Sequence, residues 1–256
     1  VFFTGSYATG RSIAERAAPK LLKVQLELGG KDPVYVCDDV DVAAAGAALA
    51  EGAFYNAGQS CCAVERIYVH RRIAPAFTDA FLESVRTFAV GDPQEETTTI
   101  GPLARKEQLE VLEAQVADAV GLGARLLCGG SRRPGSGYFF EPTVLARVDH
   151  RMRVMREESF GPIIGIQEAH DDEAAIGLMN DTVYGLTAGV YAAERARAER
   201  ILTRVNAGTA YWNCCDRVSP RLPWSGRKHS GLGSTLSLAG IRAFVQPKAW
   251  HLKSPA

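Results

Sequence analysis

The chain has 256 residues, 46% of them hydrophobic, which is enough to bury a sizeable core in one large domain or two small ones. Lysine and arginine together number 29, as do aspartate and glutamate, and this zero net charge argues against a nucleic-acid-binding surface. No apolar stretch approaches the roughly 18 residues that a membrane span needs, and we find no signal-peptide pattern. The chain starts at Val1, inside what reads as a strand, so we expect it to be a piece of a longer protein.

Residues 1–4 are predicted to form a strand, 5–10 a glycine-containing turn and 11–18 a helix. This arrangement aims backbone N–H groups and a helix N-terminus at a phosphate group. The three-glycine fingerprint of dinucleotide-binding turns is absent. An ordinary turn between a strand and a helix therefore explains this segment equally well.

Residues 23–28 are predicted to form a second strand, in which Gln25 and Glu27 share one face. If that face meets a cleft, Glu27 could act as a base with a raised pKa. Otherwise it is a solvated carboxylate on a strand. A third strand over residues 34–37 and an alanine-rich helix over residues 42–55 follow.

The alanine-rich helix ends at Asn56-Ala57-Gly58, and Gln59-Ser60-Cys61-Cys62 follows at the junction with a loop. A thiol at such a junction can point into a cleft, where backbone N–H groups lower its pKa. A thiol and a carboxylate in one cleft could carry out acyl chemistry, because the thiol attacks a carbonyl and the carboxylate activates water.

The six cysteines form two adjacent pairs and two singles: Cys37, Cys61, Cys62, Cys128, Cys214 and Cys215. Their spacing fits neither a metal site nor the disulfide framework of a small secreted domain. We therefore expect a reduced, cytoplasmic compartment. All except the Cys61–Cys62 pair are interpreted as small buried hydrophobic residues. No ligand stands at metal-binding spacing from His229, so no metal site is predicted.

The rest of the chain continues the alternation, with helices predicted over residues 73–90, 106–121, 171–180 and 194–205, and strands over residues 66–70, 123–128, 138–140, 143–148, 163–166, 185–191 and 208–213. This pattern is typical of an α/β fold with a parallel sheet. Glu157 and Glu158, taken alone, read as solvated loop charges, and Trp224 reads as exposed on an irregular loop. Residues 243–253 are predicted to be a terminal strand or arm that could complete the sheet of a neighbouring copy.

Several short motifs, in this order along the chain, resemble those of the aldehyde dehydrogenase superfamily. They are Phe3-Thr4-Gly5-Ser6, Leu26-Glu27-Leu28-Gly29-Gly30-Lys31, Gly58-Gln59-Ser60-Cys61, Glu158-Ser159-Phe160-Gly161-Pro162, Tyr211-Trp212-Asn213, Pro223-Trp224-Ser225-Gly226 and Lys228-His229-Ser230-Gly231. Their order and spacing together are far more specific than any one of them. The resemblance spans the whole chain.

The resemblance implies an aldehyde dehydrogenase-like α/β fold, in which the catalytic domain has a Rossmann-type parallel sheet and a terminal strand serves oligomerisation. Residues 1–30 would be the last part of the NAD(P)-binding domain. Residues 31–229 would be the catalytic domain with its thiol, and residues 230–256 the return segment and oligomerisation strand. The upstream part of the family's chains has no counterpart here, so we do not expect this chain alone to turn over.

The resemblance also implies roles for individual residues. Cys61 matches the catalytic nucleophile, and Glu27 matches the general base that activates water. Cys62 and Trp224 are assigned to the substrate site, with Trp224 as an aromatic wall of the substrate tunnel. Cofactor binding is assigned to Gly5, Ser6, Gly10, Leu28, Glu158 and Phe160, where the carboxylate of Glu158 would hold the nicotinamide-side ribose.

The implied activity is the oxidation of a small aldehyde to a carboxylic acid with NAD or NADP, through a thioester on Cys61, in a homodimer or homotetramer. Glu27 favours hydrolysis of the thioester over its transfer to coenzyme A. A coenzyme A-acylating dehydrogenase and an inactive or structural relative stay open as alternatives. The family often has Gly-Arg-Glu where this chain has Gly233-Ser234-Thr235, so we expect different local contacts there.

Overall fold

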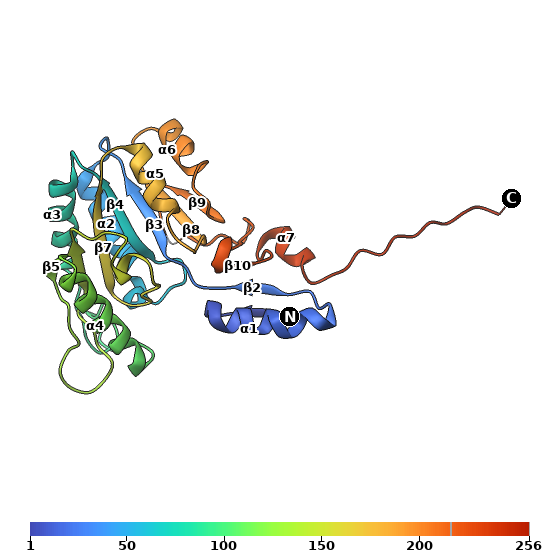
Figure 1. Cartoon of the computed structure of the whole chain (residues 1–256), viewed down its shortest axis with the longest axis horizontal. Helices are drawn as coiled ribbons and strands as arrows, with labels where there is room; N and C mark the ends of the chain where they lie inside the picture. The colour runs from blue at the N-terminus through green and yellow to red at the C-terminus, as the bar shows by residue number, and fades with distance from the viewer. Residues whose placement is uncertain (216, 256) are drawn as a thin grey trace.

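The computed structural model describes residues 1–215 and 217–255, and within them the strands form two sheets (Figure 1). The small sheet has the strand order β1-β2-β10, and the seven-stranded sheet has the order β5-β6-β7-β4-β3-β8-β9. The fold is thus mixed α/β with a mostly parallel main sheet, as predicted. The division of the chain into domains near residues 30 and 230 stays a prediction.

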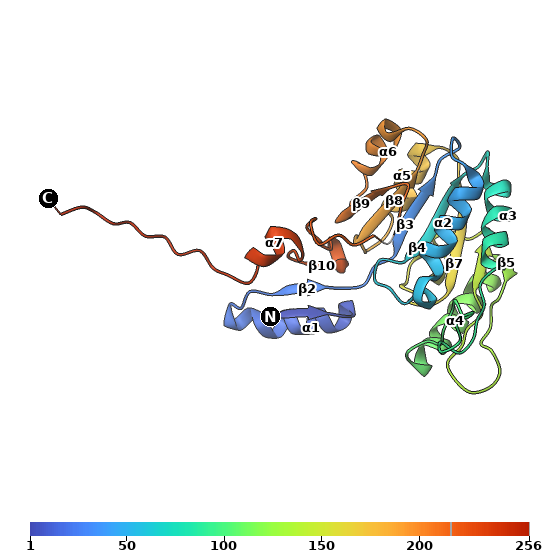
Figure 2. The ribbon, with the colours of Figure 1, turned by 180° about the vertical axis from the view of Figure 1, so that it is seen from behind.

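The small sheet brings the amino-terminal segment together with a strand near residue 231. Strand β1 (Phe2–Thr4) pairs in parallel with β2 (Gln25–Glu27), and β10 (Gly231–Leu232) pairs with β2 on the other side, antiparallel. Helix α1 (Tyr7–Ala17) connects β1 to β2 and lies beside them (Figures 1 and 2). It begins at Tyr7, earlier than predicted, because the side chain of Ser6 caps it by accepting a hydrogen bond from the Thr9 N–H. A short 3₁₀ turn (Ala18–Lys20) follows.

The main sheet is parallel except at one edge, where β5 (Arg125–Cys128) runs antiparallel to β6. Three of its inner strands, β3, β4 and β8, are buried along their whole length. This is the pattern of a parallel sheet covered on both faces. The strand bounds are β3 (Asp32–Val36), β4 (Val64–His70), β6 (Thr143–Ala146), β7 (Ile163–Ala169), β8 (Thr187–Tyr191) and β9 (Thr209–Trp212).

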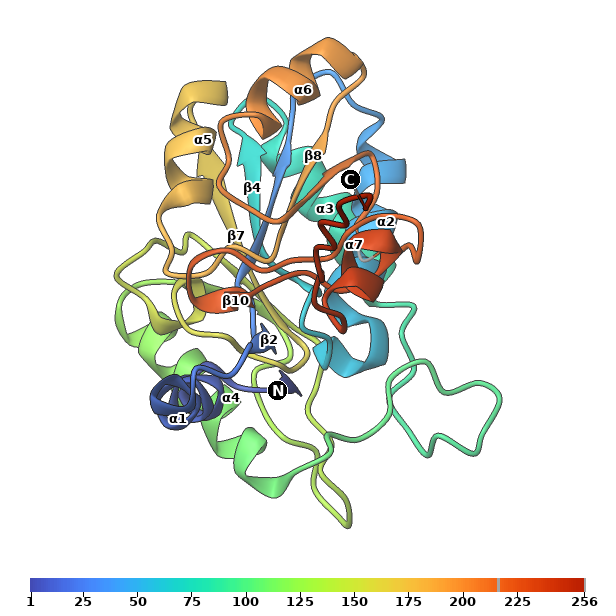
Figure 3. The same ribbon diagram turned by 90° about the vertical axis from the view of Figure 1, so that its right-hand side faces the viewer.

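Helices cover both faces of the main sheet. Figure 3 shows α2 (Val42–Phe54) and α3 (Ala74–Val85) on one side and α5 (Asp172–Asn180) on the other, with α6 (Arg195–Leu202) packed on β8 and β9. Helix α2 is rich in small residues because it packs closely on α3: a Cβ at Gly46 would stand 3.0 Å from the Phe81 nitrogen. Helix α4 (Lys106–Gly121) and the 3₁₀ turn Arg153–Met155 pack against each other beside the sheet.

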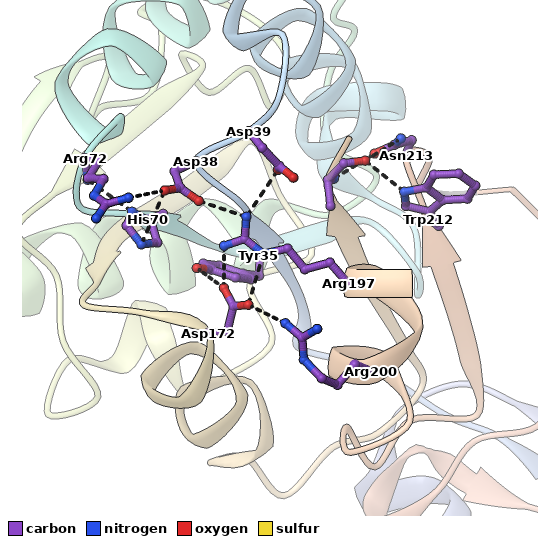
Figure 4. Close-up of polar contacts among 11 residues, drawn as sticks. Tyr35, Asp38, Asp39, His70, Arg72, Asp172, Arg197, Arg200, Trp212 and Asn213 are labelled. Carbon is purple, nitrogen blue, oxygen red and sulfur yellow. Dashed lines mark hydrogen bonds and ion pairs between the residues drawn. The ribbon is translucent and has the colours of Figure 1, made fainter. Parts of the chain in front are cut away.

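An ion-pair cluster lies at the carboxyl ends of the inner strands (Figure 4). Arg197 of α6 reaches Asp38, just after β3, at 2.8 Å and Asp172 of α5 at 2.7 Å. The Tyr35 hydroxyl donates to Asp172 at 3.0 Å. The cluster thus connects α5 and α6 to the sheet at the carboxyl ends of its strands. The predicted site residues lie at the opposite edge, in the segments that precede the strands.

The carboxy-terminal part differs in detail from the sequence predictions. Residues 243–253, predicted to be a strand or an arm, take the arm form: no strand is assigned to residues 243–255, and the segment projects from the body (Figure 2). A helix that was not predicted, α7 (Ser237–Arg242), precedes the arm. The strand predicted over residues 138–140 is wrong, because the structure has only an isolated bridge between Arg132 and Phe140 there.

Within the described residues, no helix combines the length and the apolar composition that crossing a membrane requires.

Candidate active site

A cleft of about 550 Å³ lies where the small sheet meets the main sheet. It is lined by most of the residues that the sequence predicts for the site: Gly5, Ser6, Glu27, Leu28, Cys61, Glu158 and Phe160. Segments that are far apart in the sequence thus meet in one place. Gly29 and Gly30 precede β3, Cys61 precedes β4 and Glu158 precedes β7, so the cleft lies at the amino edge of the main sheet.

The loop before Cys61 is a tight reversal of the chain. Asn56, Ala57 and Gly58 all have left-handed backbone angles, with φ of 50°, 56° and 69°. A side chain at Gly58 would collide with the Gly161 carbonyl, so only glycine fits the close approach of this loop to the segment before β7. The Gln59 side chain then fixes the turn, because its oxygen accepts from the Ala104 N–H at 2.8 Å. These contacts hold the half-buried Cys61 at the cleft.

Cys61 also lines a second cavity of about 550 Å³. Cys62, Tyr55, Asn213 and Cys214 are among the residues that line this cavity. Cys62 lines this second cavity and not the first, and its assignment to the substrate site stays a prediction.

Glu27 ends β2 and is half-buried at the cleft. Burial raises the pKa of Glu27, while hydrogen bonds from the Thr235 and Trp224 side chains act in the opposite direction and only partly offset the burial. The Thr235 hydroxyl donates to Glu27 Oε1 at 2.6 Å. A carboxylate with a raised pKa is a stronger base than an ordinary one and is suited to take a proton from water.

Glu158 is held by the glycine pair that precedes β3. The Gly30 N–H donates to Glu158 Oε1 at 3.0 Å, and a side chain at Gly29 would collide with the same carboxylate. Burial, together with the nearby charge of Glu65, raises the pKa of Glu158 to about 7. The Glu158 carboxyl group therefore lines the cleft but is largely shielded from solvent.

A buried ion pair that sequence reasoning missed fixes the loop around Glu158. Lys31 Nζ donates to Glu65 at 2.5 Å and to the Ser159 hydroxyl at 2.9 Å. The Glu65 carboxylate in turn accepts from the backbone N–H groups of Ser159 at 2.8 Å and Phe160 at 3.0 Å. The sequence does hold a signal: a lysine at the start of one apolar strand and a glutamate in another both need partners when buried.

Two predicted site residues lie elsewhere. Gly10 is at the end of the first turn of α1, where a Cβ would stand 2.5 Å from the Leu28 side chain. Its small size therefore serves helix packing, and it does not line the cleft. Trp224, predicted to be exposed on an irregular loop and assigned by resemblance to the substrate tunnel, is only 8% exposed and packs with Cys62 and Leu186. It lines neither cavity. Its side chain instead lies near Glu27 and acts to lower the pKa of that carboxyl, which burial raises.

Replacing Glu158 by glutamine is expected to stabilise the protein at neutral and higher pH. The folded-state pKa of Glu158 is raised to about 7, so folding favours the neutral carboxyl group. Its contribution to the free energy of unfolding is complete below the ordinary pKa of glutamate and is lost as the pH rises through the raised pKa. Glutamine cannot ionise and avoids this loss, which we expect to amount to about 1–3 kcal/mol at about pH 8.

Thermal unfolding of both proteins at about pH 5 and about pH 8 measures this effect. A gain that is the same at both pH values would contradict it. Glu113→Gln is a matched control, because the side-chain hydrogen bond from Arg132 lowers the pKa of Glu113 and its replacement should give no gain at the higher pH.

Fold and cleft together define an α/β protein in which a thiol and a carboxylate lie beside a strand–turn–helix unit. The aldehyde dehydrogenase family model matches residues 1–250. A betaine aldehyde dehydrogenase of Brucella anthropi is 35% identical over 257 residues, which cover 99% of this chain and 53% of that protein.

Solved structures of aldehyde dehydrogenases are also similar to this chain. The crystal structure of an NAD-dependent aldehyde dehydrogenase from Sinorhizobium meliloti matches with a TM-score of 0.97 at 36% identity, over 100% of this chain and 51% of the other. That of a betaine aldehyde dehydrogenase from Staphylococcus aureus in complex with NAD⁺ matches with a TM-score of 0.91 at 33% identity, over 95% of this chain and 49% of the other.

The chain therefore belongs to the aldehyde dehydrogenase family. It spans about half the length of the curated relatives it matches.

Proposed function

We propose that the protein oxidises a small aldehyde to a carboxylic acid with NAD or NADP as cofactor. The observation that carries this proposal is the shared cleft: Cys61, Glu27 and Glu158 reach it from three separate segments, beside the turn that opens α1. The membership of the chain in the aldehyde dehydrogenase family supports the same activity.

The cleft has the donors and acceptors that a nicotinamide dinucleotide needs. Helix α1 begins at the cleft with Gly5 and Ser6 in its lining, and a helix N-terminus favours the negative charge of a pyrophosphate. The Glu158 carboxylate, held by Gly30, can accept hydrogen bonds from ribose hydroxyls. The Staphylococcus aureus relative was solved with NAD⁺. When bound, the nicotinamide supplies the acceptor for the hydride that converts a thiohemiacetal into a thioester.

The chain's own residues perform the remaining chemistry. The Cys61 thiolate attacks the carbonyl carbon of the aldehyde, and the new C–S bond leaves a negative charge on the oxygen. The backbone N–H of Cys61 can supply a donor for this charge, in the way that preorganised donors do in acyl transfer. In the thioester stage Glu27 takes a proton from water, the hydroxide adds to the carbonyl, and the thiolate leaves as the acid is released. The carboxylate at position 27 favours hydrolysis over transfer to coenzyme A.

We further propose that the protein is a homodimer or homotetramer in a reduced, cytoplasmic compartment. The arm after α7 supports self-association, because it carries large apolar side chains that are exposed in the single chain: Phe244 at 68%, Trp250 at 71% and Leu252 at 79%. Exposed apolar segments of this kind favour a partner surface. The light-scattering mass in solution tests this, and a mass equal to that of one chain would contradict it.

The activity is tested in the protein at its full natural length. Incubation with NAD or NADP and a panel of aldehydes, including those named for the relatives, is expected to give reduced cofactor and the corresponding acid. Chromatography of the products with and without coenzyme A separates hydrolysis from acyl transfer. Formation of the acyl-coenzyme A thioester in place of the acid would contradict the hydrolytic proposal, and no reduced cofactor with any aldehyde would contradict the activity itself.

A further inference from the structure

The return segment after β10 brings one hydroxyl to the predicted base. Strand β10 pairs with β2 so that Gly231 lies opposite Glu27. A few residues later Thr235 forms a two-way backbone bridge with Trp224, with N–H to carbonyl distances of 2.7 and 2.8 Å. The backbone of Thr235 is thus held by two hydrogen bonds to Trp224, and its hydroxyl lies 2.6 Å from Glu27 Oε1.

The chemistry of this contact suits a group that changes its protonation state. A hydroxyl donates to an ionised carboxylate and can accept from a protonated one. The Thr235 hydroxyl also lies 3.5 Å from the Trp224 carbonyl, which is an acceptor for its proton when Glu27 is neutral. One rotation of the hydroxyl therefore keeps Glu27 hydrogen-bonded in both states.

We propose that Thr235 is a positioning residue for the deacylation step, because its hydroxyl orients the Glu27 carboxylate toward the water that hydrolyses the thioester. This inference rests on the proposed function and deepens it. Thr235 stands at the last position of the Gly233-Ser234-Thr235 segment, where the chain departs from the Gly-Arg-Glu pattern common in the family. In this chain a neutral hydroxyl, not a second carboxylate, contacts the base.

The hydrogen bond from Thr235 to Glu27 should affect the pH dependence of deacylation. The titratable side chains that line the same cleft, in the described part of the chain, include Cys61, Arg105 and Glu158. The two hydrogen bonds that lower the pKa of Glu27 come from Thr235 and Trp224. Loss of the Thr235 donor should therefore move the pH dependence of deacylation upward, and a glutamate at the same position should move it further, since two adjacent carboxylates resist joint ionisation.

Deacylation can be followed without a cofactor in the protein at its full natural length. An activated ester such as 4-nitrophenyl acetate acylates Cys61 in a burst of nitrophenolate, and the steady rate that follows reports hydrolysis of the thioester. We expect Thr235→Val to keep the burst and to slow the steady rate by about tenfold to hundredfold, the loss typical of one hydrogen bond to a charged group. Thr235→Ser should stay close to wild type.

A matched control is Thr78→Val, because Thr78 is similarly half-buried but donates to a backbone carbonyl in α3. Thr235→Val with the wild-type steady rate and pH midpoint would overturn the inference. If Thr235→Val loses the burst through misfolding, Thr235→Glu decides: an upward pH midpoint supports the contact and an unchanged one overturns it.

Glu27→Gln distinguishes a failure of the proposed base from a failure of the proposed positioning residue. If Glu27→Gln hydrolyses the thioester as fast as wild type, the proposed base is wrong. If Glu27→Gln is slow and Thr235→Val is not, only the role of Thr235 fails.

Discussion

Cys61→Ser is expected to lose aldehyde oxidation by about four orders of magnitude or more, as is usual when a covalent nucleophile is removed. Serine keeps the shape of the side chain, but its hydroxyl stays protonated at neutral pH and does not add to the aldehyde. The loss should appear in kcat and also in the burst of ester hydrolysis, because both need the same sulfur. Initial rates and burst amplitudes of the purified variant measure it.

Cys128→Ser serves as the control, since this thiol is half-buried on the edge strand β5, away from both cavities. It should keep full activity. The neighbouring Cys62 provides the sharper comparison. Loss of the burst in Cys62→Ser with retention in Cys61→Ser would show that the nucleophile is assigned to the wrong sulfur.

Glu27→Gln is expected to slow hydrolysis of the thioester by about 10²- to 10⁴-fold, the usual contribution of a general base. Glutamine can still accept the Thr235 hydrogen bond, so the fold of the site should survive. Formation of the thioester does not need the carboxylate, and the burst should keep its full amplitude. The acylated protein should therefore accumulate.

The pH profile adds an independent readout for the same variant. Because the base acts as the carboxylate and its pKa is raised by burial, deacylation by the natural protein should rise as the pH increases through that raised pKa and fall below it. Glu27→Gln should lack this rise. A variant that keeps both the natural rate and the natural pH profile would mean that another group activates water.

The alternation of strands and helices was predictable because the central strands are buried and their apolar runs are long. The predicted helix over residues 171–180 and the observed α5 (Asp172–Asn180) differ by one residue at the start, since Asp171 caps it in a recognisable way. Helix α7 was missed: it is short, and most of its residues are exposed. No periodicity marks so short an element.

The meeting of Cys61 and Glu27 in one cleft was implied by resemblance and not by pattern. The helix-to-loop junction indicated that a thiol near Cys61 could face a cleft, but Glu27 alone read equally well as a solvated carboxylate. Only the order of several motifs assigned the two residues to one site. The geometry of the cleft depends on close approaches between distant segments, such as Gly58 to Gly161. Contacts of that kind leave no trace in a single sequence.

The same reason explains what the sequence did not reveal. The Lys31–Glu65 pair and the Thr235–Glu27 contact each join residues from distant segments, and each depends on sheet register. Trp224 was predicted to be exposed because it lies in an irregular loop, yet the bridge to Thr235 folds that loop onto the site. Burial of loop residues is set by tertiary contacts, which local composition does not report.

The shared cleft is tested most directly by mass spectrometry of the Glu27→Gln protein after reaction with an acylating ester. We expect a single acyl group on the peptide that contains Cys61, stable for far longer than in the natural protein and absent from Cys61→Ser. An acyl group on Cys62 or another residue, or one on Cys61 that is released as quickly as in the natural protein, would contradict a thiol and a base acting in one pocket.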